Sequence, residues 1–450
     1  MVSQKRVSKR GGKVRRALLA VLLGGLMELA CSAQAEAQVV IDIFGPAIPR
    51  FPICVFPFKT EGPDVSGASQ EAQRILNQDL RISGFFELLD PSKALADPFR
   101  QGLEPREVDF EVLKLLGADI VVGGRMAMEG GNLRWEARLY DQPQRRMLFG
   151  KVYKGGSQDV RIMVHRFVDE IVKYYTGAPG IFQTQISFIS NRSGAKELML
   201  MDADGENLRQ LTQDKNLVLS PRWSPDGREV TFISYTGANA HLFALQLDVL
   251  KRRVLSAREN MNGPAAWSPD GSRIATTLSI HGNPELYLLD RSGNILQRLT
   301  QHPGIDVSPS WSPDGRSLAF VSDRAGGPQI FVMDVASGQA RRLTFEGKYN
   351  SEPAWSPRGD RIAFSSVVNG AYRICTIRPD GRDLVQLSNG AGSDNSPTWS
   401  PDGRYIAFSS TRAGGSQIYI MLFNGQNPVQ ITRIAGEQSL PAWSPWLQEH

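Results

Sequence analysis

The sequence predicts an all-β six-bladed β-propeller at residues 181–450, preceded by a small α/β domain at 38–180. The first observation is a repeat, in which the tripeptide Trp-Ser-Pro recurs six times at a constant interval of 44 residues. The second is that each copy contains four short apolar segments separated by polar turns. Four strands in a repeat of this length are typical of a propeller blade. The six copies begin at Trp223, Trp267, Trp311, Trp355, Trp399 and Trp443.

The four strands of each copy follow in a fixed order. The first strand carries Pro-x-Trp-Ser-Pro, as in 309–313, and a Pro-Asp-Gly turn follows it in four copies. Proline presets φ and glycine accepts a positive φ, so this turn joins the strands of a hairpin. The second strand resembles 406–410 and the third resembles 417–421, with a polar loop between them. A second turn leads to the fourth strand, which ends in Leu-Thr.

The register of the repeats also predicts how the ring closes. The segment that begins at Ile186 has the second, third and fourth strands of a copy, but no Trp-Ser-Pro strand precedes it. At the other end, 441–445 is a first strand with nothing after it. Joined, the two fragments make one complete blade, and the closed ring has no exposed sheet edge.

The segment before the propeller lacks the 44-residue period. Its apolar residues alternate where strands are expected and recur at helical spacing where helices are expected. The predicted strands cover 50–59, 118–123, 133–140 and 147–153, and the predicted helices cover 69–83, 108–116 and 158–175. The glycine-containing segment 177–180 is interpreted as a short hinge into the propeller.

Residues 1–37 have the pattern of a secretory signal peptide. A cluster of seven basic residues is followed by the apolar run 17–26 and by two Ala-x-Ala sites, which place cleavage after Ala35 or Ala37. The apolar run is too short for a membrane-spanning helix. Two other export routes stay open: Arg15-Arg16 as a twin-arginine signal and Cys31 as a lipidated cysteine.

The charge of the expected mature chain argues against nucleic acid as a partner. The full chain has 51 basic and 46 acidic residues, and removal of the signal takes away seven and two of them, leaving 44 of each. No basic stripe remains to bind phosphates. The two remaining cysteines, Cys54 and Cys375, fall in different predicted domains and are interpreted as buried, unreactive thiols.

The sequence shows no catalytic constellation, no metal site and no cofactor site. It has no Gly-x-Ser-x-Gly elbow, and its five histidines lack metal-ligand spacing. His281 and His302 are the pair that could still meet at the propeller mouth, as in metal-dependent lyases of this fold. The segment 202–205 (Asp-Ala-Asp-Gly) lacks the further ligands of a calcium loop and is interpreted as a turn.

Binding is the remaining class of function. The loops before each tryptophan strand share one face with the loops after each second strand, and they are polar and differ between copies. Variable loops on a constant frame are where specificity lies in such folds. The alternative is that they are solvated turns. The residues in question are Asp306, Asn350, Glu352, Asp394, Asn395, Glu437 and Gln438.

The repeats, the closing segment 441–445 and the order of the two domains resemble the TolB family of periplasmic propeller proteins in the Tol-Pal system. The segment 171–182 (Ile-Val-Lys-Tyr-Tyr-Thr-Gly-Ala-Pro-Gly-Ile-Phe) also looks like the junction of that family. The resemblance implies a non-enzymatic, monomeric scaffold that reaches the membranes through its partners. It implies a role in outer-membrane integrity and in constriction at cell division.

The resemblance also implies two partners. The lipoprotein Pal is expected at the propeller mouth, through Asp306, Asn350, Glu352, Asp394, Asn395 and Gln438. TolA is expected at the mature N-terminus, where apolar residues alternate in a way that suits strand addition to a partner sheet. That segment comprises Gln38, Val39, Val40, Ile41, Asp42, Ile43 and Phe44, and its alternative role is a first strand of the domain's own sheet.

A secreted propeller enzyme (a lyase or hydrolase) and a glycan-binding protein are the alternatives from other classes. Either would need histidine, acidic or aromatic residues that gather at the channel mouth and break the repeat. The sequence is interpreted as having no such cluster.

Overall fold

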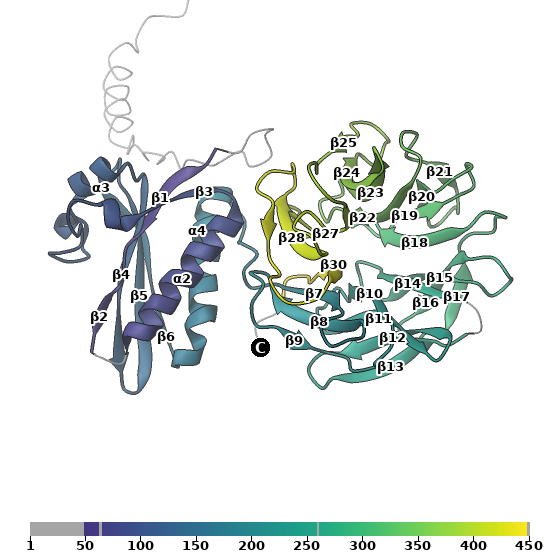
Figure 1. The fold of residues 1–450 in the computed structure, drawn as a ribbon, viewed down its shortest axis with the longest axis horizontal. Helices are drawn as coiled ribbons and strands as arrows, with labels where there is room; N and C mark the ends of the chain where they lie inside the picture. The colour runs from purple at the N-terminus through teal and green to yellow at the C-terminus, as the bar shows by residue number, and fades with distance from the viewer. Residues whose placement is uncertain (1–48, 63–64, 259–260, 448–450) are drawn as a thin grey trace, which may run out of the picture. The chain divides into compact units, whose positions relative to one another are not determined.

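The computed structural model describes residues 49–62, 65–258 and 261–447, and it contains an α/β domain followed by a propeller (Figure 1). The predicted signal peptide and the predicted TolA-binding segment, Gln38 to Phe44, lie outside the described residues. In the described part, no helix has the length and apolar character needed to span a membrane.

The α/β domain is built on one mixed sheet with the path β3-β1-β4-β5-β6, and β2 also pairs with β4. Strand β1 is parallel to β3 and β4, whereas β4, β5 and β6 form an antiparallel meander. The strands are β1 (Phe51–Val55), β2 (Lys59–Glu61), β3 (Phe86–Leu89), β4 (Ile120–Glu129), β5 (Asn132–Asp141) and β6 (Arg146–Gly155). Strand β3 was not predicted from the sequence, because it has only four residues.

Three α-helices accompany this sheet: α2 (Ser66–Ser83), α3 (Phe110–Leu116) and α4 (Val160–Thr176). Each ends at a glycine with positive φ, and Asp109 caps α3 by accepting from the backbone N–H groups of Glu111 and Val112. Helices α2 and α4 pack against each other (Figure 1). Short 3₁₀ turns cover Pro91–Lys93, Pro105–Glu107 and Ser157–Asp159.

The propeller contains six four-stranded antiparallel sheets, as predicted. Blade 1 is β10 (Val218–Trp223), β11 (Glu229–Thr236), β12 (Asn239–Gln246) and β13 (Lys251–Ser256). Blade 2 is β14 (Asn262–Trp267), β15 (Arg273–Leu278), β16 (Glu285–Asp290) and β17 (Ile295–Arg298). Blade 3 is β18 (Asp306–Trp311), β19 (Ser317–Ser322), β20 (Gln329–Asp334) and β21 (Ala340–Arg342).

The remaining blades have the same order. Blade 4 is β22 (Asn350–Trp355), β23 (Ile362–Val368), β24 (Ala371–Ile377) and β25 (Val385–Gln386). Blade 5 is β26 (Asp394–Trp399), β27 (Tyr405–Ser410), β28 (Gln417–Leu422) and β29 (Val429–Gln430). Blade 6 is β30 (Gln438–Trp443), β7 (Gln185–Ser190), β8 (Glu197–Asp202) and β9 (Arg209–Gln210).

Blade 6 confirms the predicted closure. Strand β30 pairs antiparallel with β7, with Gln438 opposite Ser190 and Trp443 opposite Ile186. The indole N–H of Trp443 donates to the hydroxyl of Thr184 at 2.8 Å, which ties the end of the chain to the entry of the ring. Strand β7 is therefore paired on both sides, by β30 and by β8.

The core of the propeller lies between neighbouring blades. One buried cluster joins Leu286 of blade 2 with Trp311 and Phe320 of blade 3. The indole N–H of Trp311 donates to the carbonyl of Ala266 in the preceding blade at 3.0 Å.

Trp223 and Trp399 donate to a neighbouring blade in the same way, whereas the indole nitrogens of Trp267 and Trp355 have no partner. The apolar area that the tryptophan buries between blades therefore explains its constant place in the sequence better than the hydrogen bond does.

Both remaining cysteines are free thiols and both are buried, as predicted. Burial raises the pKa of Cys54 to about 12 and that of Cys375 to about 11, so both stay protonated at neutral pH.

Candidate functional site

The two ends of the propeller are distinguished by the strand register. In blade 3, the first residue of β18, Asp306, pairs with the last residue of β19, Ser322, which pairs with the first residue of β20, Gln329. The connection before each first strand and the loop after each second strand therefore share one end, here called the mouth. The opposite end, here called the Trp-Ser-Pro end, carries the Pro-Asp-Gly turns.

Four of the six residues predicted to contact Pal are fully buried: Asp306, Asn350, Asp394 and Gln438. Asp394 accepts hydrogen bonds from the hydroxyl of Ser410 at 2.6 Å and from the guanidinium of Arg412 at 2.9 Å. The structure therefore corrects the prediction for these four side chains, because a buried group cannot form the surface of an interface. Their role is to hold the loops of the mouth in place.

The other three buried residues, Asp306, Asn350 and Gln438, also form hydrogen bonds within the mouth instead of facing solvent. Asp306 accepts from the guanidinium of Arg324. Asn350 donates to the side chain of Gln329 and to the carbonyl of Glu346, both at 2.8 Å. Gln438 donates to the carbonyl of Ala435 at 3.0 Å.

The other two predicted residues, Glu352 and Asn395, are partly exposed and line a pocket in the mouth. Glu352 has φ +55°, at a bulge in β22. Its carboxylate accepts hydrogen bonds from the Ser365 hydroxyl at 2.7 Å and from both the backbone N–H and the hydroxyl of Ser396, at 2.9 and 2.8 Å. Glu352 therefore links blade 4 to blade 5 as well as facing the pocket.

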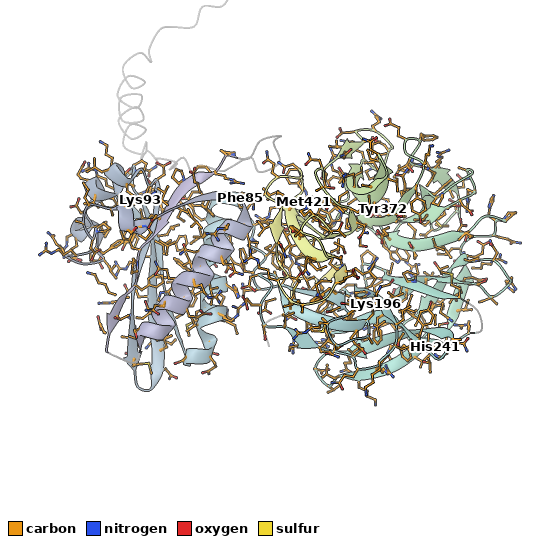
Figure 2. The ribbon with its side chains drawn as sticks, viewed as in Figure 1. Phe85, Lys93, Lys196, His241, Tyr372 and Met421 are labelled. Atoms are coloured by element: carbon orange, nitrogen blue, oxygen red, sulfur yellow. The ribbon has the colours of Figure 1, made fainter. Side chains whose placement is uncertain are left out.

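This mouth pocket has a volume of about 440 Å³, within the range of ligand sites. Its apolar wall includes Ile305 and two tyrosines, Tyr349 and Tyr372, whose rings meet edge to face at 6.0 Å. Asp323 also lines it, beside Glu352 and Asn395. Tyr372 is labelled on the propeller in Figure 2. Burial raises its pKa, with smaller contributions from Tyr349 and Glu352, so its hydroxyl stays a neutral donor.

Tyr349 and Tyr372 contradict the prediction that no aromatic residues gather at the propeller mouth outside the repeat. Position 349 is leucine, methionine, isoleucine, serine or glutamate in the other copies, and position 372 is lysine, alanine, proline or serine. Both tyrosines therefore break the repeat. A search for aromatic residues outside the register would have found them, although not that their rings meet.

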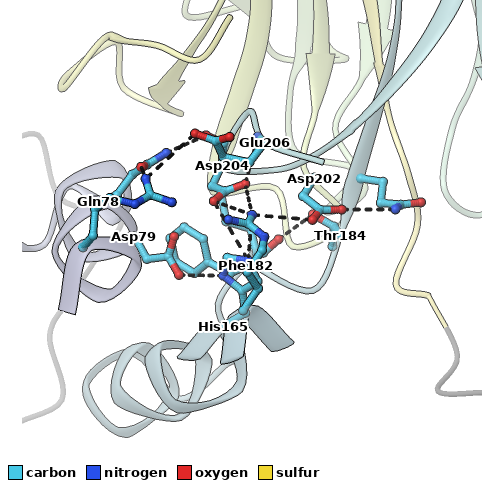
Figure 3. A network of polar contacts seen from close by, with 12 residues as sticks. Gln78, Asp79, His165, Phe182, Thr184, Asp202, Asp204 and Glu206 are labelled. Atoms are coloured by element: carbon cyan, nitrogen blue, oxygen red, sulfur yellow. Dashed lines mark hydrogen bonds and ion pairs between the residues drawn. The ribbon is translucent and has the colours of Figure 1, made fainter. Parts of the chain in front are cut away.

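A second polar cluster joins the α/β domain to the propeller (Figure 3). Helix α2 supplies Asp79, helix α4 supplies Arg161 and His165, and the turn after β8 supplies Asp204. Arg161 donates to both carboxylate oxygens of Asp204, at 2.9 and 2.8 Å. His165 Nδ1 lies 2.7 Å from the Asp79 carboxylate.

The electrostatics of this cluster follow from its burial. Burial raises the pKa of Asp79 to about 6, against the opposing effect of His165. Burial disfavours the charged form of His165, but the Asp79 carboxylate outweighs it and raises the pKa of His165. Among the described residues, the group that could hold a metal ion is Asp79, His165 and Asp204. Arg161 already supplies the positive charge there, so we interpret the cluster as an ion-pair network.

His281 and His302 do not belong to that metal-competent group of described residues. The ring of His302 accepts a hydrogen bond from the backbone N–H of Gly304 at 2.8 Å, a local loop contact. The segment 202–205 follows β8 and supplies Asp204 to the network.

The segment expected as a hinge, 177–180, is held by the propeller. Arg404 is 2 % exposed and donates to the hydroxyl of Thr176 at 2.6 Å and to the carbonyl of Pro179. The hydroxyl of Tyr405 donates to the carbonyl of Ser83 at 3.0 Å. Arg404 therefore binds the end of α4 and the junction itself, and Tyr405 binds the end of α2.

The fold and its two sites define a class: a propeller protein with a variable mouth and an α/β domain fixed to the Trp-Ser-Pro end. Residues 172–447 match the model of the TolB β-propeller domain, and residues 39–148 match that of the TolB amino-terminal domain. The chain belongs to the TolB family.

Relatives and a solved structure agree with this assignment. The chain is 43% identical over 208 residues to the Tol-Pal system protein TolB of Syntrophotalea carbinolica, an alignment that covers 46% of this chain and 48% of the relative. It is 37% identical over 217 residues to that of Anaeromyxobacter dehalogenans, covering 48% and 49%. These alignments span about half the length of the curated relatives. The crystal structure of TolB from Acinetobacter baumannii matches with a TM-score of 0.78 and 25% identity, over 88% of this chain and 97% of that one.

Proposed function

We propose that this chain is a non-enzymatic periplasmic scaffold of the Tol-Pal system that binds the lipoprotein Pal at its propeller mouth. The observation that carries the proposal is the mouth pocket, where two tyrosines outside the repeat stand beside carboxylate and amide side chains. Tyrosines in a partly enclosed pocket are frequent anchors of protein interfaces. Membership of the TolB family supports a role in the Tol-Pal system, and the signal-peptide pattern supports export to the periplasm.

We also propose that TolA binds the mature N-terminus, Gln38 to Phe44. Support comes from the alternation of apolar residues in this segment, which suits addition of a strand to a partner sheet. With one partner at each site, the monomeric chain links the cell envelope layers through those partners. This linkage would support outer-membrane integrity and constriction at division.

Calorimetric titration of residues 38–450 with the soluble domain of Pal tests the first partner. We expect Tyr349→Ala and Tyr372→Ala each to weaken binding by at least about tenfold, because buried aromatic anchors carry most of an interface's affinity. Trp446→Ala is the matched control, since Trp446 is 40% exposed, Tyr349 is 39% exposed, and Trp446 lies at the Trp-Ser-Pro end. Absence of saturable binding to the unaltered chain would contradict the proposal.

Deletion of residues 38–44 tests the second partner. We expect the shortened chain to lose TolA binding while its melting temperature stays unchanged. A simultaneous loss of thermal stability would favour the other role of this segment, a strand of the domain's own sheet.

The same pocket also favours a glycan-binding function as a second candidate. Amphipathic tyrosine rings beside Asp323 and Glu352 provide apolar faces and hydrogen-bond acceptors, the combination that orients a polar ligand in a pocket. Titration with soluble peptidoglycan fragments separates the two functions. Saturable glycan binding that Tyr372→Ala abolishes, together with no Pal binding, would replace the scaffold proposal.

A further inference from the structure

The six first strands of the blades contact one another in a closed ring, in the order β10, β14, β18, β22, β26 and β30. They are therefore the innermost strands and enclose the central channel of the propeller. The residue before each repeated tryptophan has the same place in all six strands, and these residues line a pocket of about 460 Å³ at the Trp-Ser-Pro end. They are Arg222, Ala266, Ser310, Ala354, Thr398 and Ala442.

The chemistry of this position alternates around the ring. Blades 1, 3 and 5 carry Arg222, Ser310 and Thr398, whereas blades 2, 4 and 6 carry alanine. The three polar side chains are partly exposed, and each can donate a hydrogen bond. Among the described residues that line the pocket, Arg222 is the only charged one. The channel therefore has three donors at one level, in every second blade, and no carboxylate beside them.

The charge of Arg222 has no counter-ion. Its guanidinium donates to the carbonyl of Pro221 at 2.8 Å, and within the part of the chain that the structure describes it forms no ion pair. Burial lowers the pKa of Arg222, and the negative charge of Glu352 opposes this effect. The Glu352 carboxylate, however, is already bound by Ser365 and Ser396. Arginine stays charged at neutral pH, so donors of a partly buried cation remain for an anion.

The hydroxyls of Ser310 and Thr398 also keep a donor. Each oxygen accepts a backbone N–H from the next blade, from Trp355 at 3.0 Å and from Trp443 at 3.3 Å. These bonds fix the two side chains and leave their hydroxyl hydrogens without an acceptor among the described residues. By contrast, Ser400 of a Trp-Ser-Pro motif in the same pocket donates to the aspartate of its turn. The spare donors of the two hydroxyls are therefore available to a ligand in the channel.

We propose that this ring of alternate donors binds a tetrahedral oxyanion of the phosphate class at the Trp-Ser-Pro end of the channel. The planar guanidinium of Arg222 supplies the charge and a pair of N–H groups that match two oxygens of such an anion. Donors from three alternate blades match three oxygens of a tetrahedral anion, whereas a carboxylate offers only two. The alanines of blades 2, 4 and 6 leave space between the donors.

Calorimetric titration of residues 38–450 with sodium phosphate, at constant pH and ionic strength, tests this site. We expect saturable binding to the unaltered chain and a loss of at least about tenfold in Arg222→Ala, because charge-assisted hydrogen bonds are the strong ones. Alanine is the residue of blades 2, 4 and 6 at this position, so the ring should tolerate it. Because the site lies opposite the mouth, Pal binding should be unaltered in this variant.

Arg228→Ala is the matched control. Arg228 is exposed, belongs to the same blade and follows its Pro-Asp-Gly turn, but it does not line the pocket. Its loss should change the phosphate affinity by less than about twofold, because an exposed charge is screened by salt. Equal losses in Arg222→Ala and Arg228→Ala would overturn the proposal, since they would assign binding to the overall charge of this end.

Two further anions test the geometry of the ring. Sulfate should bind like phosphate, and acetate should bind at least about fivefold more weakly, because it leaves one donor without a partner. Equal affinities for phosphate and acetate would contradict a site for a tetrahedral anion. So would the absence of saturable phosphate binding to the unaltered chain. Melting temperatures show whether the variants fold, and Arg222→Gln, which keeps a polar side chain without the charge, should show the same loss if Arg222→Ala does not fold.

Discussion

The two ends of the propeller differ in how constant their residues and contacts are from blade to blade. At the Trp-Ser-Pro end, blades 1, 2, 3 and 5 use the same contacts: a serine donates to the aspartate of its Pro-Asp-Gly turn, as Ser312 does to Asp314 at 2.6 Å. In blade 4, where Arg358 replaces that aspartate, Ser356 donates to Asp360 instead. At the mouth, by contrast, the first residue of a blade is valine, asparagine, aspartate or glutamine, and the loops around it differ between blades.

This difference separates the residues that stabilise the fold from the residues that are available to bind a partner. The uniform end carries the inter-blade tryptophans and receives the α/β domain through the turns that contain Asp204, Arg404 and Asn427. Its contacts must be repeated because every blade needs them. At the mouth, the buried polar residues hold the loops, and the exposed side chains form no repeated inter-blade contact. Those exposed side chains can therefore vary. Substitutions at the uniform end should change stability, and substitutions at the mouth should change binding.

The largest effect is expected from removing residues 437–450, which contain the closing strand β30. The deletion exposes the edge of β7 and removes Trp443, and the loss of a buried tryptophan alone costs about 3–5 kcal/mol. We expect loss of the cooperative thermal transition, measured by circular dichroism. A shortened chain with an unchanged melting temperature would contradict the role of β30 in closing the ring.

The next largest effect is expected at the junction of the two domains. Asp204→Asn removes the charge that Arg161 pairs with, and breaking a buried ion pair on one side costs about 3 kcal/mol or more. Chemical denaturation measures the loss. Glu206→Gln is the control, because Glu206 is half exposed, lies 3.9 Å from Arg74, and should change stability by less than about 1 kcal/mol. Equal effects of the two substitutions would show that the junction is not held by this pair.

The same network predicts a pH dependence. The pKa values of Asp79 and His165 are both raised in the folded state, so each contributes stability at low pH that is lost as the pH rises. For Asp79 the loss occurs between its unfolded value near 4 and its folded value of about 6. For His165 it begins at the unfolded value of about 6.5. The free energy of unfolding should therefore fall from pH 5 to pH 8.

Asp79→Asn isolates this contribution. It removes the raised carboxyl and also the negative charge that raises the pKa of His165, so we expect a flatter pH profile of the unfolding free energy. A profile with the same slope as that of the unaltered chain would assign the pH dependence to other groups, for example Asp169, whose pKa burial also raises to about 6.

The smallest effect on stability is expected at the mouth. Ile305 lines the mouth pocket but is 42% exposed, so Ile305→Ala should change the free energy of unfolding by no more than about 0.5 kcal/mol. The same variant should weaken the binding of a partner at the mouth. A large loss of stability with unaltered Pal binding would reverse the distinction between the two ends.

The sequence alone predicted most of the fold. A constant 44-residue period locates each strand, because the side chains that pack between blades must recur in the same place in every copy. The same period predicted that 441–445 completes the blade that begins at Ile186, and β30 in blade 6 confirms it. The helices α2 and α4 were also predicted, since their apolar residues recur at helical spacing. The short strand β3 was missed because four residues carry too little pattern.

Tertiary structure alone decided which polar residues are available at the mouth. Asp306 and Asp394 look like exposed loop residues in the sequence, yet arginines from the following loop bury and neutralise them. Tyr349, just before β22, meets Tyr372 of β24, and Asp79 meets His165 across 86 positions of the chain. A local pattern records which face of an element is apolar. It does not record which distant side chain completes a charge, a ring pair or a cavity, because those contacts exist only once the blades and the α/β domain have packed.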